Sequence, residues 1–289
     1  MDEVENKTFE KRPVCLLADN GSRRPEAILA LRRVAVKLAV RTGLETEAVG
    51  LLHSDEVKAE RLCGLPGETV ETCLRRRLAA GEREFLIVPF FLGPSRALTK
   101  WLLGKLEGLR REFFDLRARV APCLAGQQGD GEEVLAEAVA ERVRSCITKA
   151  GLDRPFIAFT DHGSPAREVW EVRERVGELT RRKLSDEVLG LRTCSMERRP
   201  GEAYDFNEPL LEKLLFDEEV ALGGEVVVAR FFLSPGRHAG EGGDLDRVQS
   251  DAEVTCPGLR IFATEPLGEH PLVLELLSRR TSHFLNDAG

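Results

Sequence analysis

The amino-acid sequence predicts an α/β protein of two tandem lobes, each with a four-stranded parallel sheet flanked by helices. Short apolar segments alternate with longer amphipathic ones along the whole chain, as in sheets whose strands are joined by helices. Segments of the first half also recur in the second half at a nearly constant offset. The chain has 289 residues, of which 42% are hydrophobic, so length and apolar content both suffice for two domains.

Two pairs of motifs carry the internal repeat. Residues 14–22 (VCLLADNGS) match residues 156–164 (FIAFTDHGS), and residues 90–94 (FFLGP) match residues 231–235 (FFLSP). The offsets are 142 and 141 residues, and the order of the motifs is the same in both halves. We therefore interpret the chain as a tandem duplication in which each copy carries the same structural elements.

A short polar link, Gly151-Leu152-Asp153, predicts a division into lobes at 1–150 and 151–289. Apolar runs predict the strands, and segments of helical periodicity predict the helices. In the first lobe, strands are expected near 14–18, 46–52, 84–92 and 117–121, and helices near 25–41, 68–80, 96–113 and 131–149. In the second lobe, strands are expected near 155–160, 187–192, 225–233 and 258–264, and helices near 165–183, 207–222, 241–250 and 270–284. Val226, Val227 and Val228 are continuous and β-branched, as expected for a strand covered on both faces.

Composition argues against several classes of protein. A net charge of −7 without a long basic run argues against nucleic-acid binding, and no apolar run approaches the ~18 residues that span a bilayer. Met1–Arg12 lacks the apolar segment of a secretion signal, and the seven cysteines are scattered and never spaced as C-x-x-C. We therefore predict a cytoplasmic protein without disulfides or membrane contact. No glycine-rich nucleotide-binding loop is found where one would be needed, so no organic cofactor is expected. The oligomeric state does not follow from the sequence.

Three side chains suited to a metal ion follow three strands of the second lobe. His162 follows the first strand, Glu197 the second and His238 the third. Ligands of open α/β sheets bind beyond the carboxyl ends of the strands. Imidazole and carboxylate groups suit iron, cobalt, nickel and zinc, and neutral imidazole can also act as a base. The pattern predicts a metal site of His162, His238 and Glu197, although single loop histidines and acidic loop residues are more often simply solvated or hydrogen-bonded.

The first lobe lacks these groups. Asn20 stands where His162 stands, and Ala97 stands where His238 stands. Glu56 corresponds roughly to Glu197 across a loop of similar length. Because an asparagine is a poor ligand for a transition metal, we expect the first lobe to keep only a shaping or substrate-holding role.

These motifs resemble the class II tetrapyrrole chelatases of the sirohydrochlorin cobaltochelatase and ferrochelatase type. The opening Gly-His-Gly-Ser signature of that family is matched by residues 161–164 (DHGS), with Asp161 in place of the first glycine. Residues 232–238 (FLSPGRH) and 267–271 (LGEHP) match the stretches that follow its third and last strands. The resemblance covers nearly the whole chain as two lobes, of which the first lacks both histidines.

The resemblance implies insertion of a divalent metal ion, iron or cobalt with nickel possible, into an anionic tetrapyrrole during siroheme or cobalamin biosynthesis. The metal is then a substrate, held by His162 and His238, which also assist removal of the pyrrole protons. Glu197 is implied as a third ligand or proton acceptor. Arg198, Arg199 and Arg237 flank these residues and could pair with substrate carboxylates.

Two other functions remain open from the residues alone. A non-catalytic metal-binding or tetrapyrrole-binding protein with the chelatase fold would need the same histidines. A small-molecule enzyme on a similar doubly wound fold is disfavoured by the missing nucleotide-binding loop.

Overall fold

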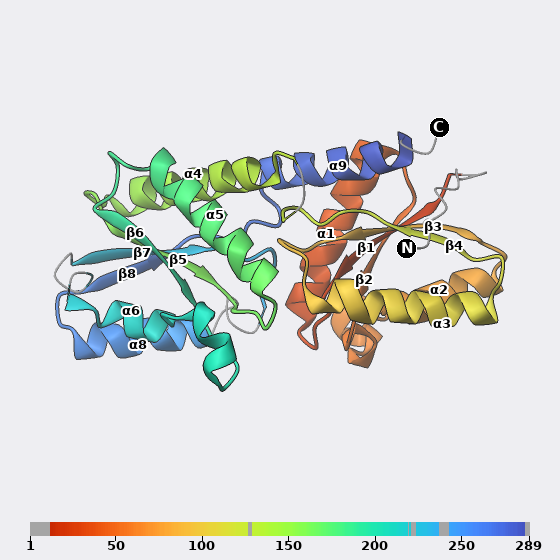
Figure 1. Ribbon diagram of the computed structural model, residues 1–289, viewed down its shortest axis with the longest axis horizontal. Coiled ribbons are helices and arrows are strands. Elements are labelled where there is room, and N and C mark those ends of the chain that lie inside the picture. The colour runs from red at the N-terminus through yellow and green to blue at the C-terminus, as the bar shows by residue number, and fades with distance from the viewer. Residues whose placement is uncertain (1–11, 127–128, 219, 221–223, 237–242, 287–289) are drawn as a thin grey trace. The chain divides into compact units, whose positions relative to one another are not determined.

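The protein contains two four-stranded parallel sheets with the same strand order. The computed structural model describes residues 12–126, 129–218, 220, 224–236 and 243–286. The strand order is β2-β1-β3-β4 in the first sheet and β6-β5-β7-β8 in the second (Figure 1). This agreement confirms the predicted α/β fold class and the expected equivalence of the two halves.

The first sheet follows the sequence-based expectation closely. Its strands are β1 (Val14–Asp19), β2 (Thr46–Gly50), β3 (Glu84–Pro89) and β4 (Arg117–Val120). Its helical segments are α1 (Pro25–Thr42), the 3₁₀ turns η1 (Ser54–Glu56) and η2 (Ala59–Leu62), α2 (Val70–Ala79), the π-helical η3 (Ala97–Leu102) and α3 (Leu103–Glu112). The central strands β1 and β3 are almost wholly buried, as strands covered by helices on both faces must be.

The second sheet differs from expectation next to strand β6. Its strands are β5 (Phe156–Asp161), β6 (Gly190–Ser195), β7 (Glu225–Arg230) and β8 (Arg260–Ala263). Its helical segments are α5 (Arg167–Lys183), the 3₁₀ helix η4 (Glu202–Asn207), α6 (Leu211–Leu215) and α8 (Asp244–Thr255). Strand β6 begins three residues later than predicted. The helix expected over 207–222 begins only at Leu211 and α6 ends at Leu215; the late start follows from Pro209, which has no amide hydrogen and cannot lie inside a regular helix.

Two long helices close the two halves of the sequence, α4 (Gly131–Ala150) and α9 (Pro271–Asn286). The chain forms two compact units: α4, from the first half of the sequence, belongs to the second unit, and most of α9, from the second half, belongs to the first unit. One unit comprises residues 1–91, 96–124 and 274–289, and the other comprises 92–95 and 125–273. The expected division at residue 150 therefore separates the repeats in the sequence but does not coincide with the compact units.

Helix α4 belongs to the second unit because it packs beside α5 and β7. Ion pairs reinforce this packing: Arg144 with Glu187, and Lys183 with Glu137, at 2.9 and 3.1 Å. None of the helices in the described part of the chain is long and apolar enough to cross a membrane.

Candidate metal site at the carboxyl edge of the second sheet

His162 and Glu197 lie next to each other where β5 and β6 end. Asp161 and Ser195 are the last residues of these strands and are partners in the parallel register. Beyond them the ladder continues: Met196 N–H donates to the Asp161 carbonyl at 2.8 Å, and Glu197 N–H donates to the His162 carbonyl at 3.1 Å. Both His162 and Glu197 are exposed. The sheet thus brings two of the three predicted ligands together on its carboxyl edge.

A glycine makes this close approach possible. Gly163 has a φ of +85°, in the left-handed region, and a Cβ atom there would lie 1.8 Å from the Glu197 carbonyl oxygen. Only glycine allows both the turn and the contact. On its other side, the His162 ring packs edge-on against Phe232, with 4.2 Å between ring centroids. Phe232 is buried and follows β7, so segments after three strands contribute to the surroundings of His162.

The third predicted ligand is not placed by the structure. His238 and the neighbouring Arg237 lie outside the described residues, which resume at 243 after Gly236. The expected convergence of His162 and His238 on one metal ion therefore stays a prediction.

A buried charged network lies beneath His162. Arg173 of α5 is only 1% exposed, and its guanidinium donates to the Ser195 hydroxyl and to Asp161 Oδ1, the latter at 3.4 Å. The Ser195 hydroxyl and the Gly163 N–H also donate to Asp161 Oδ1, at 2.7 and 3.0 Å. Burial raises the pKa of the Asp161 carboxyl, and the Arg173 charge and these hydrogen bonds oppose that rise. The network joins the ends of β5 and β6 to α5.

The segment between Glu197 and α6 is hydrogen-bonded to the turn that contains Gly163 and Ser164. Asn207, at the end of η4, accepts a hydrogen bond from the Ser164 N–H and donates one to the Ser164 carbonyl, both at 3.0 Å. Phe206 packs near Trp170 of α5, with 5.9 Å between ring centroids, and the Arg167 guanidinium lies 4.9 Å from the centre of the Trp170 ring. The end of η4 is therefore held against the turn after β5 and against α5.

The predicted substrate-binding arginines differ in their surroundings. Arg198 forms ion pairs with Asp205 at 2.9 Å and with Glu208 at 2.8 Å, so its charge is already matched within this segment. Arg199 is exposed. Their role toward a substrate stays a prediction.

The first lobe builds the same turn without metal ligands. Gly21 N–H donates to Asp19 Oδ1 at 2.8 Å, and Leu52 N–H donates to the Asn20 carbonyl at 3.2 Å. A Cβ atom on Gly21 would lie 1.6 Å from the Leu52 carbonyl oxygen. Leu52 therefore occupies the place of Glu197, and the expected correspondence with Glu56 is wrong.

Glu56 has a different role from that of Glu197. It accepts a hydrogen bond from Arg23 at 2.6 Å and lies 2.8 Å from the His53 ring. The loop length alone suggested the equivalence, whereas the strand register decides it.

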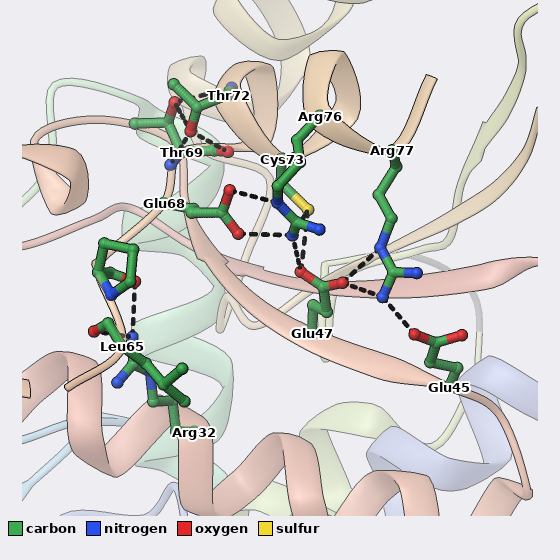
Figure 2. Close-up of polar contacts among 11 residues, drawn as sticks. Arg32, Glu45, Glu47, Leu65, Glu68, Thr69, Thr72, Cys73, Arg76 and Arg77 are labelled. Atoms are coloured by element: carbon green, nitrogen blue, oxygen red, sulfur yellow. Dashed lines mark hydrogen bonds and ion pairs between the residues drawn. The ribbon is translucent and has the colours of Figure 1, made fainter. Parts of the chain in front are cut away.

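A second group of possible ligands proves to be an ion-pair cluster. Among the described residues, ligand atoms of Glu47, Glu68 and Cys73 lie within 4.8 Å of one another. Figure 2 shows the Arg76 guanidinium between the two carboxylates, 2.5 Å from Glu47 and 2.7 Å from Glu68, with Arg77 on the far side of Glu47. Burial and the neighbouring carboxylate raise the pKa of the Cys73 thiol, which disfavours the thiolate that a metal would need. We interpret this cluster as a set of ion pairs that stabilises the packing of α2 against β2.

Sequence reasoning missed Arg173 and Ser195. One signal was present: Arg173 lies on the apolar stripe of α5 with Val169, Val172 and Val176. A charged residue at such a position must be paired when it is buried. Its partner Ser195 was not recognisable, because a serine at a strand end is common.

Comparisons with known proteins support this description. The CbiX family model matches residues 157–284. A curated relative, the chloroplastic sirohydrochlorin ferrochelatase of Arabidopsis thaliana, is 28% identical over 172 residues. That match covers 59% of this chain and 63% of the relative, so the chain spans less than two thirds of the length of that protein.

Solved structures share the fold over nearly the whole chain. SirB from Bacillus subtilis with Fe³⁺ has a TM-score of 0.68 and 14% identity, covering 95% of this chain and 96% of SirB. SirB of Bacillus subtilis subspecies spizizenii in complex with cobalt has the same score and identity, with 96% of each chain covered. CbiX, described as the terminal enzyme of siroheme biosynthesis in denitrifying bacteria, has a TM-score of 0.59 and 16% identity, covering 94% and 99%. The chain is thus similar to CbiX-type chelatases in sequence over residues 157–284 and in fold over nearly its whole length.

Proposed function

We propose that this protein is a sirohydrochlorin chelatase that inserts a divalent metal ion, iron or cobalt, into the tetrapyrrole. The observation that carries the proposal is the direct backbone contact between His162 and Glu197 at the carboxyl edge of the second sheet. The proposal is supported by the name of the curated relative, a sirohydrochlorin ferrochelatase, and by the related SirB structures with Fe³⁺ and with cobalt. Siroheme or cobalamin biosynthesis is the expected pathway.

The reaction requires a metal ligand and a proton acceptor on one face of the macrocycle. Two pyrrole N–H protons leave as one dication enters, so the charge of the macrocycle is conserved. The imidazole of His162 can bind a first-row metal at about 2 Å in its neutral form, and a neutral imidazole can also accept a proton near pH 7. We propose that His238 is the second imidazole ligand, and that Glu197 is the third ligand or the proton acceptor.

Basic residues around this edge are proposed to hold the carboxylates of the substrate. Arg198, Arg199 and Arg237 remain the candidates, since a guanidinium can bind a carboxylate through two hydrogen bonds. Arg198 already contacts Asp205 and Glu208, so we expect Arg199 and Arg237 to contribute most of the substrate affinity. The first lobe, with Asn20 and Leu52 in place of the ligands, is proposed to shape the substrate site and not to bind metal.

The test is metal insertion measured by absorbance. The protein is incubated with an excess of sirohydrochlorin and with Co²⁺ or Fe²⁺, and the spectral change of the macrocycle is followed over time. We expect many turnovers per protein molecule and a loss of at least about 100-fold in His162→Ala, because this variant removes a ligand. Asn20→Ala is the matched control and should have only a mild effect on the rate, because the first lobe has no partner histidine with which to bind a metal.

Two outcomes would change the conclusion. A spectral change that stops at one equivalent would favour the alternative function, a metal-binding or tetrapyrrole-binding carrier. Wild-type turnover in His162→Ala would overturn the proposed site.

A further inference from the structure

We propose that Arg173 is a positioning residue that holds His162 and Glu197 in one fixed arrangement, through Asp161 and Ser195. The inference rests on the proposed function of His162 and Glu197 as metal ligands. Arg173 itself is fully buried and makes its contacts below the exposed edge, so it acts through other residues and not on the substrate.

The contacts of Arg173 join three separate segments. Its guanidinium binds Asp161, which directly precedes His162, and Ser195, which precedes Glu197 by two residues. It also lies 3.4 Å from the carbonyl oxygen of Phe206 in η4. A buried guanidinium is costly unless its donors are satisfied, so each of these contacts restrains the segment that provides it.

The first lobe shows that the turn alone does not need an arginine. Leu31 is the equivalent of Arg173 in the first lobe. Helices α1 and α5 begin six residues after Asp19 and Asp161, respectively, and Leu31 and Arg173 each lie six residues after the first residue of their helix. The β1–β2 register places Gly50 where Ser195 stands in the second lobe. The turn at Asp19 nevertheless has the same glycine geometry and the same carboxylate hydrogen bond.

Arg173 is therefore not needed to form the turn, and its contribution is to connect the ends of β5 and β6. The lobe with His162 has a guanidinium that connects the ends of β5 and β6, and the lobe with Asn20 has a leucine and a glycine at those places. A ligand pair tolerates little displacement, since an error of about 1 Å can lower a rate by ~100-fold. Arginine suits this task because its planar group donates in several fixed directions, which lysine cannot do.

Hydrogen exchange tests the proposal without relying on activity. In Arg173→Leu, we expect the amides of Gly163 and Glu197 to exchange at least about tenfold faster than in the wild type, because their segments lose a shared anchor. The equivalent amides of Gly21 and Leu52 in the first lobe serve as internal references and should be unchanged. Arg175→Leu is the matched control, since Arg175 lies on the same helix but pairs with Glu132 at the surface.

Kinetics provides the second readout. We expect kcat for metal insertion to fall by about 10–100-fold in Arg173→Leu, with the KM for sirohydrochlorin within about twofold of the wild type. Arg173→Lys should recover only part of both losses. His162→Ala should lose insertion but keep wild-type exchange at Gly163, which separates a failure of the proposed function from a failure of this inference.

A second variant keeps the proposal testable if Arg173→Leu does not fold. Arg173→Leu combined with Ser195→Gly reproduces the residues that the first lobe already accommodates, and we expect it to fold and to show the same faster exchange. Wild-type exchange at Gly163 and Glu197 in this double variant, or in Arg173→Lys, would overturn the proposal, whether or not the protein proves to be a chelatase.

Discussion

At the scale of single residues, the two turn glycines form a matched pair. Gly163 and Gly21 have φ values of +85° and +86°, and each lies against the carbonyl of the neighbouring loop. We expect alanine at either position to lower the free energy of unfolding by about 2 kcal/mol or more, through left-handed backbone strain and the displaced carbonyl. Gly163→Ala should also weaken Co²⁺ binding by about tenfold, because it moves Glu197. Equal Co²⁺ affinity in Gly163→Ala and Gly21→Ala, measured by titration, would contradict this.

The half-buried carboxyl of Asp19 in the first lobe predicts a pH dependence. Burial raises the pKa of Asp19 from 3.8 to about 6, and its hydrogen bond from Gly21 only partly opposes the rise. Between pH 4 and 6 the folded protein then binds more protons than the unfolded chain. Its free energy of unfolding falls as the pH rises through this window, by up to about 3 kcal/mol. Asp19→Asn should reduce this fall, as measured by urea unfolding of both proteins at several pH values. Parallel pH profiles for the two proteins would rule it out.

The proximity of His162 and Glu197 could be predicted from the sequence, but its support could not. Parallel strands end on one edge of a sheet, so residues that follow neighbouring strands must lie close together. The network of Asp161, Arg173 and Ser195 depends instead on the strand register and on the face that α5 buries. The periodicity of α5 can indicate that Arg173 is buried, but the strand register that makes Asp161 and Ser195 its partners is not determined by local periodicity.

At the scale of elements, His270 begins a helix and belongs to no metal site described here. Its Nδ1 accepts the Leu272 N–H at 3.3 Å, at the start of α9, and its Nε2 lies 3.3 Å from Glu141. Burial and the nearby Arg142 lower the pKa of His270, which keeps the imidazole neutral and its Nδ1 free to accept. The motif Leu-Gly-Glu-His-Pro is thus explained by helix capping.

Substitution of His270 should affect stability and not chemistry. We expect His270→Ala to lower the free energy of unfolding by about 2–4 kcal/mol, through the lost cap and the cavity left by a buried ring. His270→Asn should restore about 1 kcal/mol, because asparagine is a good helix cap. Thermal unfolding measures both effects, and kcat for metal insertion should stay within about twofold. A large loss of kcat in a folded His270→Asn variant would show that the histidine has a catalytic role.

Strand β6 begins and ends three residues later than predicted, and this shift has a physical reason. Its last residues, Thr193, Cys194 and Ser195, form no apolar run that would predict a buried strand, and the buried Ser195 hydroxyl donates to Asp161 and accepts from Arg173. The apolar Val188, which lies within the expected strand near 187–192, is buried in the segment that precedes β6 instead. Here a tertiary hydrogen bond outweighs local hydrophobicity.

At the scale of the whole molecule, the repeat in the sequence and the compact units divide the chain differently. The amphipathic pattern of α4 predicts a helix with one apolar face, but it does not reveal which sheet that face covers. Leu135, Val139 and Val143 on this face are at most 1% exposed, and the helix packs beside α5 and β7 of the second unit. The 274–289 segment, with most of α9, belongs in turn to the first unit.

Cutting the chain at the repeat boundary should therefore damage both halves. Fragment 151–289 lacks α4. The loss of the contacts that bury the three apolar residues of α4 would cost roughly 5–8 kcal/mol, which is comparable to the ~5–15 kcal/mol stability of a typical domain. We expect 1–150 and 151–289 each to unfold without cooperativity when alone. When mixed, they should form a one-to-one complex that unfolds cooperatively near the midpoint of the intact chain, as followed by circular dichroism in urea. Cooperative unfolding of 151–289 alone at that midpoint would show that α4 is dispensable for the second unit.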